Sequence, residues 1–332
     1  MMIKRRFQSR ITKGKSTLPF AILLAIACWV ITYSVKPESL AKKPASPLWQ
    51  MLQGLLPNEF TGIAISFILY SLIGYLLIEF NNAYSIIRMR ASVQTSLFLI
   101  IVAACPELYP LQSGTIAAIT LLAAIYFLFK CYQQIHPVNY MFFGYFFIGL
   151  GSIIFPKLML FIPIFIIGAY NFQALSARTF FAGLIGFSIP YWFLFGHAFF
   201  YNQMELFYQP FIELITFPPA DYKAVQLWEI ITVGFSTALL IISSIHSFAT
   251  SYLDKIRTRS YLNFFILLEI GTLILMVFLP AQATDFFPIL FSGGSILAGH
   301  LFALTDNKVS NLFFMFTLIS LTALFVSNLW ML

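Results

Sequence analysis

The sequence predicts an all-α, polytopic membrane helix bundle, and three observations support this fold class: its composition, its apolar runs and its charge distribution. Hydrophobic residues make up 60% of the 332 residues and charged residues 9%, whereas soluble domains contain roughly 45–50% and about 25%. The 39 phenylalanines are too many to bury in a soluble fold of this length. The composition therefore excludes a soluble enzyme, a nucleic-acid-binding protein and a disordered scaffold.

Eleven apolar runs approach the ~20 residues that a helix needs to cross a bilayer. The fifth and sixth runs are short and only Pro156-Lys157 separates them, so one re-entrant unit is an alternative to two spans. Together they are too long for a single span, and ten spans is the nearest competing count. The runs cover about residues 17–35, 61–79, 92–108, 112–129, 139–155, 158–172, 179–200, 227–248, 261–280, 286–304 and 309–331.

The lysines and arginines predict the orientation, because basic residues favour cytoplasmic loops. With eleven spans and a cytoplasmic N-terminus, 14 of the 19 lie inside. A missed span in the middle would move every later loop to the other side, so this split favours a topology with the N-terminus in and the C-terminus out. It also explains the net charge of +7 without a nucleic-acid partner. The inside set is Lys4, Arg5, Arg6, Arg10, Lys13, Lys15, Arg88, Arg90, Lys130, Arg178, Lys255, Arg257, Arg259 and Lys308, and the outside set is Lys36, Lys42, Lys43, Lys157 and Lys223.

The spans divide the chain into a basic cytoplasmic N-terminal tail, residues 1–16, and a single multi-pass transmembrane domain, residues 17–332. The first span follows basic residues as a signal peptide does, but its apolar run is long for one, so we expect an uncleaved span. We expect the protein to lie in a bacterial cytoplasmic (inner) membrane, with membrane lipids as its surroundings.

Two long loops, residues 36–60 and 201–226, fall on the outer side. In the first, the apolar residues of the stretch 47–56 share one helical face, which predicts a short helix in the outer interface. In the second, Pro218-Pro219 breaks any helix, and the many aromatic residues favour the same interface. No segment has the length or polarity of a soluble domain, so we expect chemistry within the membrane or at its outer face.

Glu269 is the clearest candidate for a functional group inside the membrane, because it lies near the middle of the ninth run. A charge there costs roughly 2.5–3.5 kcal/mol on insertion scales, so an ionisable residue is a functional hypothesis by default. One interpretation is a proton or cation site, or a contact for the polar head of a substrate. The other is a protonated acid hydrogen-bonded to a neighbouring helix, which costs much less than a charge.

No metal site or cofactor is expected from the histidines and cysteines. The topology places His197 near the outer face but His246 and His300 near the inner face, so the three cannot bind one metal. Each histidine is interpreted as a packed or interfacial residue. The three cysteines show no metal-ligand spacing and are interpreted as buried.

Arg88 and Arg90 lie in the first inner loop. Arginine suits the phosphates of lipids or pyrophosphates, so the pair is a candidate for substrate binding. Topology alone also accounts for the two residues, and we favour that explanation.

Four charged residues of the outer loops form a second candidate site. Glu38 follows the first span, Glu59 ends the first outer loop and Glu107 lies in the tight turn between the third and fourth runs. Lys157 lies in the turn between the fifth and sixth. Acids and a lysine that converge there would supply a base and a phosphate contact. They are equally compatible with ordinary loop charges.

This layout resembles that of polyprenyl-phosphate-sugar-dependent glycosyltransferases of the C superfamily. Those proteins have a large first outer loop with an interfacial helix and a catalytic acid, a second acidic outer turn and a later basic outer turn. The matching pieces are Glu38 with the stretch 47–56, then Pro106-Glu107, then Pro156-Lys157. The family usually carries an aspartate close after the first span, where this chain has Lys36-Pro37-Glu38. The chain is also similar to a group of bacterial multi-pass membrane proteins of unknown function.

Three hypotheses for function follow. The first is a glycosyltransferase-like enzyme that acts on a polyprenyl-phosphate-linked glycan at the outer face. Glu38 or Glu59 would then be the base, Glu107 a second acid and Lys157 a phosphate contact. The second is a non-catalytic subunit that packs against a membrane protein partner. The third is a transporter or flippase that uses Glu269. A deep outer cavity would favour the enzyme and a sealed bundle the subunit.

Overall fold

The computed structural model describes residues 7–12, 14–35, 47–54, 56, 58–87, 92–217 and 222–331. Within these residues all regular structure is helical. The α-helices are α1 (Phe7–Thr12), α2 (Thr17–Val35), α3 (Pro47–Gly54), α4 (Glu59–Tyr84), α5 (Val93–Ala103), α6 (Ser113–Lys130), α7 (Val138–Ile154), α8 (Ile162–Asn171), α9 (Ala177–Phe200), α10 (Met204–Ile215), α11 (Leu227–Ala249), α12 (Ile256–Phe278), α13 (Ala283–Leu304) and α14 (Lys308–Met331). Short 3₁₀ turns are η1 (Pro106–Leu108), η2 (Pro156–Phe161), η3 (Tyr222–Ala224), η4 (Ser251–Leu253) and η5 (Pro280–Gln282).

Each of the eleven apolar runs coincides with helical structure in the described part of the chain. Eight of the described helical segments are long and apolar enough to cross a membrane. Three are shorter, namely α5, α7 and the segment formed by η2 and α8. The all-α class is therefore confirmed for these residues, and the apolar helices indicate a multi-pass integral membrane protein. The number of crossings and their orientation stay predictions.

Proline and capping residues set several of the helix boundaries. Pro156 follows α7 and begins the turn η2, which shortens the helices on both sides of it. α9 begins after Ser176, whose hydroxyl accepts a hydrogen bond from the Thr179 amide at 3.3 Å. Such a cap satisfies one of the amides that a helix start leaves without a partner. α10 ends at Ile215, before the Pro218-Pro219 pair that predicted a break.

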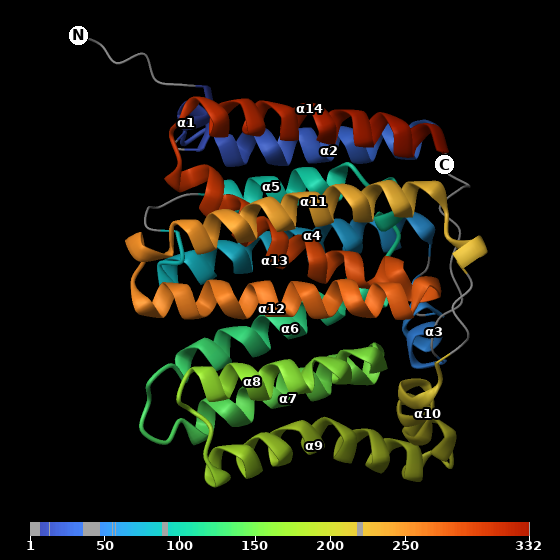
Figure 1. Ribbon diagram of the computed structural model, residues 1–332. Helices are drawn as coiled ribbons and strands as arrows, with labels where there is room; N and C mark the ends of the chain where they lie inside the picture. The colour runs from blue at the N-terminus through green and yellow to red at the C-terminus, as the bar shows by residue number, and fades with distance from the viewer. Residues whose placement is uncertain are drawn as a thin grey trace.

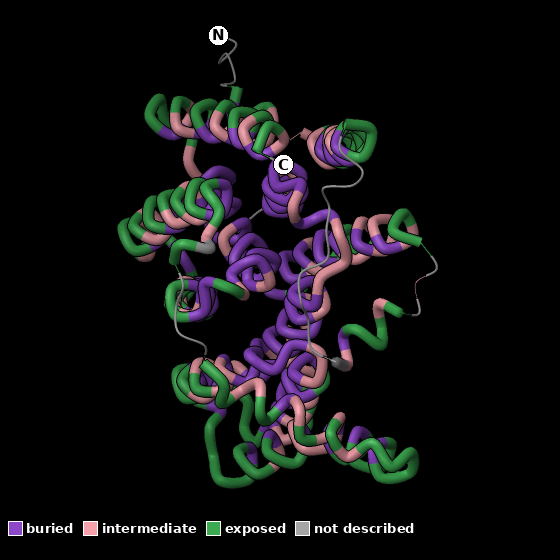
Figure 2. The backbone as a smooth tube through the Cα atoms, turned by 90° about the vertical axis from the view of Figure 1, so that its right-hand side faces the viewer, coloured by how far each residue is buried: buried purple, intermediate pink, exposed green. Residues whose placement is uncertain are grey.

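The helix α13 lies at the centre of the bundle (Figure 1). It packs against α5, α6, α11 and α12, and nearly all of its side chains are buried. Figure 2 shows this buried core as a continuous stretch through the middle of the molecule, with exposed residues around it. A helix that is apolar on all sides fits such a position. Outer helices instead expose large apolar side chains, such as Trp192 and Phe193 of α9, which suits contact with lipid.

The two ends of the bundle differ in charge. The turns 131–137, 172–176 and 250–255 lie at the same end as α1, whereas α3, α10 and the C-terminus lie at the opposite end (Figure 1). We name the first the basic end, because Lys130, Arg178 and Arg257 all lie there. The second is named the α3–α10 end. By the distribution of basic residues, the basic end is expected to face the cytoplasm.

The helix α3 matches the interfacial helix expected over residues 47–56. Trp49 is buried against the protein, whereas Met51 and Leu52 are exposed. α10 is a second short helix at this end, and it packs against α3. The sequence indicated an interfacial second loop but not this helix.

Candidate functional site

The Glu269 carboxyl is buried in the middle of the bundle. Glu269 lies near the midpoint of α12, and its exposed fraction is 0%. Neither carboxyl oxygen has a hydrogen-bond partner in the described part of the protein. The alternative of an acid hydrogen-bonded to a neighbouring helix therefore finds no partner among these residues. A buried polar group without a partner costs roughly 1–3 kcal/mol in protein mutational data, so this side chain opposes folding.

Gly293 of α13 makes the space that the carboxyl occupies. A Cβ atom at Gly293 would lie 1.8 Å from Oε1 of Glu269, far inside van der Waals contact. Only glycine therefore allows the carboxyl to lie against the α13 backbone in this position. Gly293 is at the middle of α13, as Glu269 is at the middle of α12, so the contact lies at half the depth of both helices.

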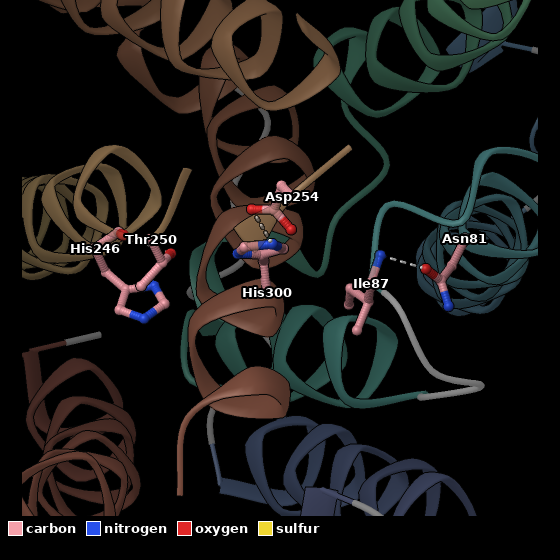
Figure 3. Close-up of polar contacts among 6 residues, drawn as sticks. All are labelled: Asn81, Ile87, His246, Thr250, Asp254 and His300. Carbon is pink, nitrogen blue, oxygen red and sulfur yellow. Dashed lines mark hydrogen bonds and ion pairs between the residues drawn. The ribbon is translucent and has the colours of Figure 1, made fainter. Parts of the chain in front are cut away.

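His300 of α13 and Asp254, which lies in the turn before α12, form a pair towards the basic end (Figure 3). His300 Nε2 and Asp254 Oδ2 are 3.4 Å apart, and each side chain is 1% exposed. His300 follows Gly293 by seven residues on α13, which is two helical turns, about 10 Å, on nearly the same face. Asp254 precedes the first turn of α12. We name Glu269, Gly293, His300 and Asp254 the α12–α13 seam.

His246 of α11 lies beside this pair. The rings of His246 and His300 are 6.2 Å apart between centroids, and neither nitrogen of His246 has a hydrogen-bond partner among the described residues. Figure 3 shows His246 and Thr250 on one side of the ion pair and Asn81 with Ile87 on the other. The Asn81 side-chain oxygen accepts a hydrogen bond from the Ile87 amide at 2.7 Å, which closes the end of α4.

The sequence placed His246 and His300 at the same end of the bundle but gave no reason to pair them. His197, near the end of α9, lies at the opposite end, as expected. Asp254 was not singled out, because it lies in a short turn among charged neighbours. The one available signal was topological, since an acid next to the start of α12 and a histidine near the end of α13 must share one end of the bundle.

The sequence interpretation missed two further acids at the α3–α10 end, the half-buried Asp285 and the buried Glu229. Asp285, in the first turn of α13, accepts hydrogen bonds from the Ser113 hydroxyl at 2.9 Å and the Gly114 amide at 3.2 Å. It therefore caps the start of α6, where a negative charge is favoured. Glu229 of α11 accepts a hydrogen bond from the Thr284 hydroxyl at 3.1 Å. Both carboxylates link neighbouring helices.

Lys157 is buried and its ammonium holds α10. Its Nζ donates to the carbonyls of Leu214, at 3.2 Å, and Thr216, at 2.8 Å, and lies 4.1 Å from the centre of the Phe217 ring. These contacts cap the carbonyl end of α10, where a cation is favoured. Burial raises the pKa of the neighbouring Glu213, while its hydrogen bond from Gln209 and the charge of Lys157 act to lower it.

The remaining predicted site residues divide into two groups. Glu59 is exposed at the start of α4 and Glu107 is half-buried in η1, both at the α3–α10 end. Glu38, Arg88 and Arg90 lie outside the described residues. No hydrogen bond or ion pair joins Glu59, Glu107 and Lys157 to one another in the described structure.

The described residues contain no group of three or more histidine, cysteine, aspartate or glutamate side chains that could hold a metal ion. Carboxyl groups and histidines are side chains that can take up and release protons. Comparison with known proteins supplies no further guide: the chain matches no protein-family model, no curated protein and no solved structure.

Proposed function

We propose that the protein is a proton-coupled membrane transporter or flippase in which Glu269 is the coupling group. The observation that carries the proposal is the fully buried Glu269 carboxyl, which has no hydrogen-bond partner among the described residues. Ionisable residues inside transmembrane helices commonly mark ion and proton pathways. A group that opposes folding and caps no helix is best explained by a role that needs its proton.

The seam supports a path for that proton towards the basic end. Glu269 lies at half depth, and the His300–Asp254 pair lies about two turns of α13 closer to the basic end. A histidine beside a carboxylate can take up a proton and pass it on. In this proposal the pair passes protons between the cytoplasm and Glu269, and a movement of α12 against α13 exposes the carboxyl to the other side.

Proton flux in proteoliposomes tests the proposal. The full chain is reconstituted, a pH difference and a membrane potential are imposed, and an enclosed pH indicator reports proton entry. We expect Glu269→Gln to lower the flux to that of protein-free liposomes, because an amide cannot carry the proton. Glu205→Gln is the matched control, since Glu205 is an exposed acid of α10. Equal fluxes for wild type and Glu269→Gln would refute the role of this carboxyl.

The protonation of Glu269 provides a second readout that does not depend on the substrate. A hydrophobic carbodiimide reacts with a protonated carboxyl in apolar surroundings, and peptide mass spectrometry locates the product. We expect modification of Glu269 to slow when the pH rises at the basic end. His300→Gln should weaken this pH response while leaving the modification itself intact. Modification that is insensitive to pH on that side would contradict the path.

A second candidate is the enzyme at the outer face, and the position of α3 favours it. Gln53 of α3 donates to the Leu111 carbonyl at 3.4 Å, next to the turn that carries Glu107. Leu48 of the same helix packs on the cluster of Met159, Tyr191 and Leu194, near Lys157. α3 thus connects the outer turns that the glycosyltransferase resemblance requires. The buried contacts of Lys157 instead favour a structural role for that residue.

The enzyme hypothesis has its own test. Glu38, Glu59 and Glu107 are replaced by glutamine one at a time, and the surface glycans of the cells are compared. A change with any variant that is produced at wild-type levels supports the enzyme. Wild-type glycans in all three variants would exclude this mechanism without affecting the role of Glu269.

A further inference from the structure

A cluster of tyrosines at the basic end holds two cations. It consists of Tyr84, Tyr126, Tyr132, Tyr140 and Tyr261, together with Lys130 and Arg257. The members come from the ends of α4, α6 and α12, the start of α7 and the turn after α6. We name this set the tyrosine cradle. Tyrosines are enriched at the level of lipid headgroups, so the position of the cradle at helix ends fits the membrane surface.

Arg257 is held in place by three rings and one hydrogen bond. Its guanidinium carbon lies 5.4–5.9 Å from the ring centres of Tyr84, Tyr132 and Tyr261, within the range of cation–π attraction. Its Nε donates to the Tyr261 hydroxyl at 2.6 Å. The Tyr261 hydroxyl donates in turn to the Phe129 carbonyl at 3.0 Å. The guanidinium is therefore oriented before any ligand arrives.

Lys130 lies on the neighbouring rings of the same cradle. Its Nζ is 4.7 Å from the centre of the Tyr126 ring and 5.6 Å from that of Tyr140. Tyr126 and Tyr84 are in edge contact, with centroids 5.4 Å apart, and the Tyr84 hydroxyl donates to the Tyr126 carbonyl. Contacts between rings thus connect the site of Lys130 with that of Arg257.

Neither cation forms an ion pair with an acid of the described part of the chain. The terminal nitrogens of Arg257 likewise donate to no described residue. Four N–H groups of a fixed, planar guanidinium are therefore available to an anion. A planar guanidinium fork matches the oxygens of a phosphate.

Apolar side chains flank the cradle on the chain itself. Leu253 and Ile256, which precede Arg257, have exposed fractions of 55% and 68%. A soluble anion gains no binding energy from aliphatic side chains, whereas the acyl chains of a lipid would cover them. The combination of oriented cations, interfacial tyrosines and exposed aliphatic side chains distinguishes this site from basic residues that only set the topology.

We infer that the tyrosine cradle binds the phosphate of an anionic phospholipid from the membrane leaflet at the basic end. Arg257 and Lys130 contact the headgroup, and the acyl chains lie along Leu253 and Ile256. Basic pockets between membrane helices on the cytoplasmic side are known to hold anionic lipids. This inference does not depend on proton transport by Glu269.

Lipid titration of the purified full chain, followed by native mass spectrometry, tests the inference. The probes are phosphatidylglycerol, zwitterionic phosphatidylcholine and inorganic phosphate as a competitor. We expect the wild type to retain phosphatidylglycerol in preference to phosphatidylcholine, with no displacement by inorganic phosphate. Arg257→Gln and Lys130→Gln should each weaken the binding of phosphatidylglycerol about 5-fold, because one basic residue near an anionic surface contributes about that factor.

Two further variants separate a built site from general positive charge. Arg178→Gln removes an exposed cation of the same end that lies outside the cradle, and we expect it to bind phosphatidylglycerol as the wild type does. Tyr261→Phe keeps all charges but removes the partner of Arg257, and we expect weaker binding. Thermal unfolding in the same detergent checks that each variant is folded.

Three outcomes would overturn the inference. Equal losses for Arg178→Gln and Arg257→Gln would show that only total charge matters. Wild-type binding by Tyr261→Phe would show that the orientation of Arg257 is irrelevant. Displacement by inorganic phosphate would assign the site to a soluble anion rather than to a lipid.

Discussion

Two acidic side chains, one in the first turn of α13 and one packed against its middle, differ in their hydrogen bonding. At the α3–α10 end, Asp285 accepts hydrogen bonds from the Ser113 hydroxyl and the Gly114 amide. Half-way along, α13 presents Gly293 to the Glu269 carboxyl, which has no partner among the described residues. Both contacts depend on a glycine that lets an acidic residue approach a neighbouring helix. Only the first converts that approach into hydrogen bonds.

The hydrogen-bonded acid is expected to contribute to stability, and the acid without hydrogen-bond partners to function. A carboxylate whose oxygens accept hydrogen bonds joins helices and stabilises the fold, whereas a buried carboxyl without partners opposes folding. Variants at the first contact should therefore lower the free energy of unfolding. Variants at the second should change proton binding and lower the free energy of unfolding less than variants at the first, or raise it.

The largest effect is expected from Gly114→Ala at the first contact. The new Cβ would lie 1.9 Å from the backbone oxygen of Asp285. Because backbone cannot move aside as a side chain can, α6 and α13 must separate, and the free energy of unfolding should fall by about 3 kcal/mol. Unfolding in mixed micelles measures this. Gly234→Ala in α11 is the control, since its Cβ would meet no atom within 4 Å. Equal stability of the two variants would contradict the close contact.

Asp285→Ala should have the next largest effect. It leaves the Ser113 hydroxyl and the Gly114 amide without their acceptor, which costs roughly 1–3 kcal/mol. Asp285→Asn keeps one oxygen in place and should lose less. The same unfolding measurement compares the two, and a loss for Asn as large as that for Ala would show that the negative charge, rather than the acceptor, is what α6 requires.

Much of the helical architecture was predictable from the sequence. The different surroundings of the Asp285 and Glu269 side chains were not. The apolar runs predicted the helices because burial in lipid demands about 20 apolar residues in a row, and the position of Glu269 within a run predicted its depth. Which atoms an acid meets depends on helix rotation and packing. Asp285 and Ser113 are far apart in the chain, and neither residue type nor spacing relates them.

The contacts within the α12–α13 seam and those of Lys157 also depend on helix packing, which the sequence does not reveal. Topology predicted that His246 and His300 share one end, but the pairing of His300 with Asp254 depends on how α12 packs on α13. Lys157 was predicted as a phosphate contact from its turn alone. Its burial against the end of α10 could not be predicted, because the helix α10 was itself not expected.

Gly293→Ala addresses the second contact. Its Cβ would overlap the Glu269 carboxyl, which is the end of a flexible side chain, so the carboxyl can turn away. The loss in the free energy of unfolding should be about 1–2 kcal/mol, smaller than for Gly114→Ala. The displaced carboxyl should show an altered rate of carbodiimide modification. An unchanged rate together with unchanged stability would mean that the carboxyl does not lie against α13.

The smallest change in stability, and the only gain, is expected from Glu269→Met. Methionine fills a similar volume without a polar group, and replacing an unsatisfied buried polar group by an apolar one is neutral or stabilising. The free energy of unfolding should rise by up to about 1 kcal/mol, while proton flux in proteoliposomes is lost. A variant that is more stable but inactive is what a group retained for function requires. If Glu269→Met instead unfolds more easily than the wild type, the carboxyl stabilises the fold. Glu269 would then belong with Asp285, and the contrast between the two halves of α13 would disappear.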